Sequence, residues 1–264
     1  MYAFEYSRAA SVDEAVQQVA AGGQVLAGGQ TLIATMKQRL AAPGRLVDLG
    51  RISGLVGIKK DAQGLTIGAM TTHAAVAASA EVQAAIPALA DLAGQIGDRQ
   101  VRARGTLGGS LANNDPAACY PSAVLALGAT VITNKREIAA DDFFQGMYAT
   151  ALEADELITA VRFPVPKRAA YVKFKQAASR FALVGVFVAD TGQGVRVAVT
   201  GAAQSGVFRH AGLEAALTAS FEPGAVDAVA VDASDLNQDI HASAAYRAHI
   251  IKVVTARAVA KAAA

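Results

Sequence analysis

The sequence predicts an α+β fold, and three observations support that class. Helical and strand-like patterns alternate over residues 11–130, strand-like runs dominate from there to residue 203, and helical patterns fill the tail. Segregation of β-rich and helical stretches in this way is typical of α+β proteins. Of the 264 residues, 53% are hydrophobic and 17% are charged, which supplies enough apolar surface for a sizeable core.

The first part of the chain is typical of βα units. Ser11 and Glu14 stand in capping-box spacing, and Gly22 is the glycine that commonly follows a helix. Beyond it, "QVLAGG" indicates a short strand that enters a turn. In "TLIATMKQRL" apolar residues recur at helical spacing, and "GRLVDL" is typical of a second strand. The predicted elements are a helix over 11–22, a strand over 24–29, a helix over 31–40 and a strand over 44–49.

A hairpin and several helices are predicted for the middle of the chain. The hairpin turns at Asp61–Gly64, Pro87 ends one helix and begins the next, and Pro121 stands at the first position of a further helix. A segment rich in Gly, Asn and Pro precedes Pro121, and it is long enough to indicate a functional loop. The predicted elements are a hairpin over 55–70, helices over 72–86 and 87–98, a loop over 99–121 and a helix over 122–129.

The last part is predicted to combine an antiparallel meander with a helical tail. Its strand-like runs are "ELITAVRFP", "AAYVKFKQA", "FALVGVFVAD" and "GVRVAVTGA". Helices are expected over 211–220 and 241–262, and the second of these places Tyr246, Ile250, Val253 and Val254 on one face. The segment Pro164–Pro166 is the best single domain boundary.

Composition excludes several classes of protein. The net charge is only +2, no Lys/Arg block occurs and Trp is absent, so nucleic-acid binding is not expected. A single cysteine, Cys119, excludes an internal disulfide and a Cys-ligated metal centre held by this chain alone, and it indicates a cytoplasmic protein. The N-terminus lacks a signal-peptide pattern, and the longest uncharged stretch, 116–134, contains two prolines, so no membrane span is expected. The four histidines lack metal-ligand spacing.

Two glycine pairs carry the strongest functional signal. Gly28 and Gly29 lie between an apolar run and a helix start, where backbone N–H groups can hold a phosphate without a Cβ in the way. The alternative is a tight turn in which Thr31 is an ordinary N-cap. Gly108 and Gly109, flanked by two hydroxyl residues, repeat the pattern. Neither pair belongs to a GxGxxG or GxxxxGK[ST] motif, and two such loops could converge on one pyrophosphate.

Six stretches, in order along the chain, resemble landmarks of one family. They are "LAGGQTLIATMKQRLAAPGRLVDL", "LTIGAMTTHAAV", "IGDRQVRARGTLGGSLANNDPAA", "DELITAVRFP", "YVKFKQAASRFALVGV" and "DIHASAAYRAHI". The family is the FAD-binding medium subunit of molybdenum hydroxylases, which includes the carbon monoxide dehydrogenase flavoprotein and the flavin domain of xanthine dehydrogenase. The resemblance implies an FAD-binding domain of the PCMH/vanillyl-alcohol-oxidase type in two parts, residues 1–53 and 54–165, followed by a smaller C-terminal domain of antiparallel sheet plus helices at 166–264.

The resemblance also implies partners. A large subunit would carry molybdopterin and a small subunit would carry [2Fe–2S] clusters, with the complex forming a dimer of heterotrimers. This chain would bind FAD, receive electrons from the clusters and pass them to an external acceptor, without catalytic residues or metal ligands of its own. Two alternatives stay open: a stand-alone FAD-dependent oxidoreductase of the same fold, and a non-enzymatic protein whose glycine loops are only turns.

By position, the resemblance implies FAD contacts from two loops and several single residues. A lysine beside the flavin would favour negative charge on the reduced ring, whereas the alternative is a solvated charge on an edge strand. Cys119 stands where many family members have Asp, so that contact could pass to Asp115, or the thiol could simply fill buried space. The implied residues are Ala27, Gly28, Gly29, Gln30, Thr31, Leu32 and Ile33; Thr106, Leu107, Gly108, Gly109 and Ser110; and Ile96, Asp115, Cys119, Leu157 and either Lys173 or Lys175.

Overall fold

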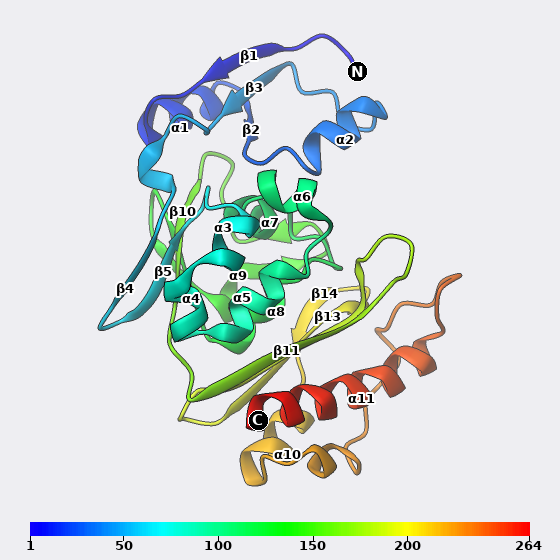
Figure 1. Cartoon of the computed structure of the whole chain (residues 1–264). Helices are drawn as coiled ribbons and strands as arrows, with labels where there is room; N and C mark the ends of the chain where they lie inside the picture. Colours follow the sequence, from blue (N-terminus) through cyan, green and yellow to red (C-terminus); the bar gives the residue numbers. More distant parts are fainter.

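The computed structural model describes residues 1–264, which contain three sheets of three to five strands (Figure 1). The first sheet has the order β1-β3-β2, and both pairings are parallel. Parallel strands need crossover connections, which the two helices of this part supply. The elements are β1 (Glu5–Arg8), α1 (Val12–Ala20), β2 (Gln24–Leu26), α2 (Leu32–Lys37) and β3 (Arg45–Asp48).

The second helix of this part is shorter than predicted. It ends at Lys37, because Arg39 adopts a left-handed conformation with φ of 62°. The amides of Arg39 and Leu40 donate to the carbonyls of Met36 and Thr35 at 3.1 and 2.9 Å, which is the Schellman pattern. Leu40, which the spacing places on the helix, is 75% exposed. The first helix agrees with its predicted cap, since the Ser11 hydroxyl accepts from the Glu14 amide.

The second sheet is antiparallel with the order β4-β5-β10-β6-β7. The predicted hairpin is confirmed by the pairing of Asp61 with Gly64. The run "ELITAVRFP" forms β10 in the centre of this sheet and not in the meander, which corrects the prediction. The strands and the short elements near them are η1 (Ser53–Leu55), β4 (Ile58–Asp61), β5 (Gly64–Gly68), β6 (Thr130–Thr133), β7 (Glu137–Ala139), β8 (Phe144–Gly146), β9 (Ala149–Thr150) and β10 (Ile158–Phe163).

Helices cover one face of this second sheet. The predicted helix over 72–86 is two helices, because Ser79 is extended and its hydroxyl accepts from the amide of Val82 to begin the second one. The predicted loop over 99–121 contains two helices, separated at Gly105. The helices are α3 (His73–Ala78), α4 (Ala80–Ala85), α5 (Pro87–Gly94), α6 (Arg99–Arg104), α7 (Leu107–Asn113), α8 (Tyr120–Ala126) and α9 (Ala140–Phe143).

The third sheet is the predicted antiparallel meander, with the order β11-β12-β13-β14. Strand β12 of this sheet is buried on both faces. Phe187 joins the core around α5 and α8, whereas Val186 and Val188 join the core under α10 and α11. The helix layer therefore lies between the second and third sheets (Figure 1). The elements are β11 (Arg168–Lys175), β12 (Ala182–Asp190), β13 (Val195–Ala203), β14 (Gly206–Arg209), α10 (Ala211–Ala219), η2 (Pro223–Val226) and α11 (Ala244–Ala263).

The last helix buries a different face from the predicted one. Ile250 and Val254 are buried as expected, but Tyr246 is 43% exposed, and the neighbouring Arg247 is buried in its place at 3% exposure. A charged residue inside the apolar face hides the true periodicity from a hydropathy pattern. No helix in the chain has both the length and the apolar character required to cross a bilayer. The α+β class predicted from the sequence is confirmed.

Candidate functional site

The segment between β2 and α2 presents a run of unpaired backbone N–H groups. None of the amides of residues 27–32 donates to an acceptor within the protein. Thr31 has helical backbone angles and makes no capping bond, so the alternative of an ordinary N-cap is wrong. Gly29 has φ of 72°, which lets the chain turn into α2. Consecutive free donors of this kind suit an anion, and four of the six residues, 27–30, line a cavity.

The glycine at position 28 is required by the protein backbone itself. A Cβ there would clash with the carbonyl oxygen of Arg104 and lie 2.8 Å from the Cα of Gly105. Gly28 therefore allows the loop after β2 to contact the end of α6. This differs from the reason that the sequence suggests, namely close approach by a ligand.

The second glycine segment has a different role from the first. Gly108 is buried, its amide donates to the Ala69 carbonyl at 2.8 Å, and a Cβ would lie 2.6 Å from that of Ala69. The Leu107 amide donates to Thr71, and the Thr106 hydroxyl accepts from the Gly109 amide at 3.2 Å to cap α7. Most donors of this segment are thus already used. The segment anchors α7 against the second sheet.

The two glycine segments nevertheless meet. A Cβ built on Gly109 would lie 3.5 Å from the Cβ of Ala27, and both Gly109 and Ser110 are half-buried. The predicted convergence of the two segments is therefore present in the fold, with the first segment offering free amides and the second forming an adjacent wall.

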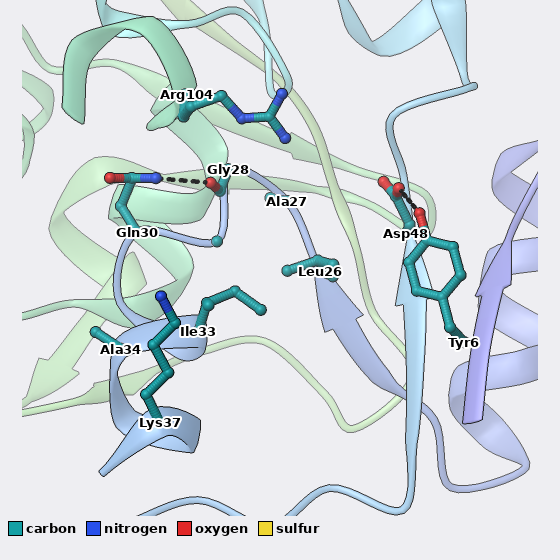
Figure 2. A pocket seen from close by; sticks show the side chains of 11 residues that line it. Tyr6, Leu26, Ala27, Gly28, Gln30, Ile33, Ala34, Lys37, Asp48 and Arg104 are labelled. Atoms are coloured by element: carbon teal, nitrogen blue, oxygen red, sulfur yellow. Dashed lines mark hydrogen bonds between the residues drawn. The ribbon is translucent and has the colours of Figure 1, made fainter. Parts of the chain in front are cut away.

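A cavity of about 470 Å³ opens beside the free amides (Figure 2). Two cations line it, Lys37 from α2 and Arg104 from α6, and neither side chain makes an ion pair or hydrogen bond. The Asp48 carboxylate, also in the wall, accepts from the Tyr6 hydroxyl and, at 2.7 Å, from the Gly50 amide. The lining residues are Tyr6, Leu26, Ala27, Gly28, Gly29, Gln30, Ile33, Ala34, Lys37, Asp48 and Arg104.

The position of the cavity follows from the parallel sheet. Leu26 and Asp48 are the last residues of β2 and β3, so the cavity lies at the carboxyl edge of that sheet. Ligands of open α/β sheets bind at this edge. Lys37, Asp48 and Tyr6 line the cavity but belong to none of the motifs in the sequence that indicate a site. Of these three, only Asp48 has a feature in the sequence that could have indicated a place in the site, namely its position at the end of a predicted strand.

The remaining implied residues lie outside this cavity. Ile96 is half-buried, and its carbonyl accepts from Arg102 at 2.9 Å. Leu157 is buried in an apolar cluster with residues of the first sheet. Asp115 accepts from the Ala117 amide at 2.8 Å and from the Tyr148 hydroxyl at 3.4 Å. None of these three residues lines the cavity.

Lys173 and Cys119 form a second group of implied residues. The Lys173 ammonium donates to the carbonyls of Gln95 at 2.7 Å and Arg180 at 3.1 Å, and it lies 3.6 Å from the Cys119 sulfur. Cys119 is 6% exposed, which agrees with a thiol that fills buried space. Lys175, at the end of β11, is exposed and is not part of this group.

His73, whose amide donates to the Gly105 carbonyl at 2.9 Å, makes the stability of the fold depend on pH. Burial, and then the charge of Arg102, lower its pKa from 6.5 to about 4. Below pH 6.5 His73 gains a proton in the unfolded chain but not in the folded one. Its contribution to the free energy of unfolding is therefore fully present above pH 6.5 and is lost as the pH falls from 6.5 to 4. The loss contributed by this one group is on the order of 3 kcal/mol.

Urea unfolding at pH 7 and pH 4.5 measures this loss. We expect the free energy of unfolding of the His73→Gln variant to change less between these two pH values than that of the unaltered chain, because glutamine does not titrate. The exposed His249→Gln is the matched control and should keep the original slope. Equal slopes for the unaltered chain and the His73 variant would contradict the assignment.

The fold and the site together define a protein that can hold a diphosphate at the edge of a small parallel sheet. Six free amides and two unpaired cations fit the charge and the acceptor oxygens of such a group. A family described as the FAD binding domain in molybdopterin dehydrogenase matches residues 2–166. The chain belongs to this family, among the FAD-binding medium subunits of molybdenum hydroxylases, as the sequence resemblance predicted.

Relatives and solved structures match most or nearly all of the chain. The carbon monoxide dehydrogenase medium chain of Hydrogenophaga pseudoflava is 34% identical, over 86% of this chain and 84% of that protein. The nicotine 6-hydroxylase medium subunit of Paenarthrobacter nicotinovorans is 35% identical, over 98% of this chain and 97% of that protein. A chain of reconstituted CO dehydrogenase from Oligotropha carboxidovorans superposes with a TM-score of 0.90 at 33% identity, covering 99% of this chain and 98% of that chain.

Proposed function

We propose that this chain is the electron-transfer subunit of a molybdenum hydroxylase complex. It takes electrons from [2Fe–2S] clusters on a small partner subunit and passes them from its FAD to an external acceptor. Substrate is oxidised elsewhere, at the molybdopterin of a large partner subunit. The single cysteine supports this division of labour, because this chain alone cannot ligate an iron–sulfur cluster through cysteines.

One observation carries the FAD assignment: the free amides of residues 27–32 beside the unpaired Lys37 and Arg104. We assign the cofactor's diphosphate to this place, in contact with residues 27–33 and with the neighbouring wall at Gly109 and Ser110. Thr106, Leu107 and Gly108 then act by holding that wall in position. Bound FAD supplies the redox chemistry, and the residues of the chain bind and orient it.

We assign the flavin ring to the side of the molecule that carries Lys173. Its ammonium, close to Cys119, would favour added negative charge on a neighbouring ring. Lys173 is preferred over Lys175 because its amine is fixed by two carbonyls. We assign Ile96 and Asp115 to the same flavin site, and Leu157 to the apolar contact with the first sheet.

We further propose three domains, 1–53, 54–165 and 166–264, and a dimer of heterotrimers in the cytoplasm. The family match over residues 2–166 supports the second boundary, as does the start of the third sheet at Arg168. The first sheet, which ends at Asp48, supports the first boundary.

Purification from the native host under mild conditions tests the function. We expect a yellow complex that contains FAD, molybdenum and iron in addition to this chain. Reduction of the flavin by substrate should require the large subunit. A lone chain that turns over a small substrate without other subunits would support the stand-alone oxidoreductase instead, and a colourless chain that takes up no FAD would contradict both.

A further inference from the structure

The single cysteine of the chain lies against two hydrogen-bond donors of one strand. Cys119 directly precedes α8 and is 6% exposed. Tyr171 and Lys173 are two residues apart on β11, so their side chains leave the strand on the same face. Tyr171 belongs to the same apolar core as Cys119, and the Lys173 ammonium lies 3.6 Å from the Cys119 sulfur. The face of β11 that carries both donors is therefore the one that meets the thiol.

The hydroxyl of Tyr171 lacks an acceptor. It is completely buried and makes no hydrogen bond. Burial, and then the neighbouring Cys119, hold its pKa well above the usual range, so the hydroxyl keeps the proton that it can donate. A buried donor without a partner destabilises a fold, and a thiol sulfur is too weak an acceptor to satisfy it.

Lys173 brings a positive charge to the same place. Two of its three N–H groups donate to the carbonyls of Gln95 and Arg180 at 2.7 and 3.1 Å, and the third is directed to the Cys119 sulfur. No carboxylate forms an ion pair with this ammonium. A charged donor and an unpartnered hydroxyl thus surround a weak acceptor. An anionic oxygen attached to the sulfur would satisfy both of them.

We propose that Cys119 is a site of reversible oxidation by hydrogen peroxide. One peroxide oxygen forms an S–O bond as the O–O bond breaks, so the sulfur loses two electrons and the other oxygen leaves as water. The thiol proton passes to the solvent, and the resulting sulfenate oxygen accepts from the Lys173 ammonium and the Tyr171 hydroxyl. Because the chain has no second cysteine to condense with this product, the two donors are what stabilises it.

Oxidation of Cys119 would also affect the flavin, and this consequence rests on the proposed function. There, the Lys173 ammonium favours negative charge on the reduced ring. A sulfenate next to the ammonium compensates part of its charge, so the flavin should become harder to reduce and its reduction potential should fall. Peroxide would thereby decrease the flow of electrons through this subunit.

The first test treats the full chain, as purified, with hydrogen peroxide. The reaction is stopped in urea that contains dimedone, which traps sulfenic acid whether or not it is buried in the fold. Mass spectrometry of the peptide that contains Cys119 then gives the rate of oxidation. We expect the folded chain to react about tenfold or more faster than a chain already unfolded in urea, because only the fold supplies the two donors. A folded chain that reacts no faster than the unfolded one would overturn the proposal.

Two variants assign this rate to the donors. Tyr171→Phe removes only a hydroxyl that has no partner, so the reduced protein should keep or raise its melting temperature, while trapping should slow about tenfold. Lys173→Met should slow trapping by a similar factor because it removes the charge. Lys175→Met is the matched control, since Lys175 is exposed on the same strand, and it should react as the unaltered chain does. Trapping that is as fast in both variants as in the unaltered chain would overturn the site.

A Cys119→Asp variant tests the effect on the flavin. It places a permanent carboxylate between the same donors, and Cys119→Asn is its neutral counterpart. We expect the Asp variant to melt at a higher temperature than the Asn variant and, with FAD bound, to have the lower flavin reduction potential. Equal potentials would overturn the effect on the flavin. A chain that binds no FAD would overturn the proposed function, whereas the trapping experiment needs no flavin and would still decide whether Cys119 is oxidised.

Discussion

A Gly28→Val variant should fold but purify almost without FAD. The valine Cβ would clash with the carbonyl oxygen of Arg104 and lie 2.8 Å from the Cα of Gly105, and both are backbone atoms that cannot rotate away. The loop must therefore move off α6, which takes the free amides of residues 27–32 away from Arg104 and opens the cavity. The measurement is the ratio of flavin absorbance to protein absorbance after purification, and we expect a loss of at least about tenfold, comparable to losing a charge-assisted bond.

Two comparisons give this result its meaning. Gly44→Val is the matched control, because no atom lies within 4 Å of a Cβ at that position and it belongs to the same part of the chain. It should retain FAD. Gly108→Val should behave differently again, since its Cβ would be forced against Ala69 in the core and should lower the melting temperature of the whole chain. A Gly28→Val protein with normal flavin content would show that the loop does not need its contact with α6.

The glycine pairs show what the sequence can and cannot reveal about this site. Paired glycines beside a helix start predict a phosphate site, and the unpaired amides of residues 27–32 support that prediction. Their spacing does not reveal why each glycine is needed, because Gly28 meets α6 and Gly108 meets Ala69, both distant in sequence. Arg104 could be seen near the second pair, but its place opposite the first pair depends on how the two parts dock.

The fold was predictable to a similar degree. Local signals, such as the Ser11 cap and the hairpin at Asp61–Gly64, gave elements that the structure contains. Long-range pairing was not visible: β10 looks like the first strand of the meander, yet it pairs with β5 and β6. A strand's period-2 pattern reports which faces are buried and not which sheet buries them. The resemblance to a family, carried by specific glycine and proline positions, supplied what the patterns alone lacked.

An Arg247→Met variant should lose on the order of 3 kcal/mol of unfolding free energy. Arg247 is 3% exposed, and one of its guanidinium nitrogens donates to the carbonyls of Leu183 at 2.9 Å and Gly201 at 3.1 Å. The other terminal nitrogen donates to Asp239 at 2.7 Å. Methionine preserves most of the apolar stem but removes every donor, so two buried carbonyls in β12 and β13 lose a partner. Denaturant unfolding followed by circular dichroism measures the loss.

Arg257→Met on the same helix separates this effect from a general change in charge or helix propensity. Arg257 is exposed and makes no ion pair, so its replacement should change stability by less than about 0.5 kcal/mol. Asp239→Asn adds a second distinction, because Asp239 is 42% exposed and an asparagine oxygen can still accept from Arg247. If the two carbonyls are the reason that Arg247 is buried, Asp239→Asn should cost much less than Arg247→Met. Equal losses would place the stabilisation in the ion pair with Asp239, which lies in the segment before α11, and not in the bonds from Arg247 to the backbone of the third sheet.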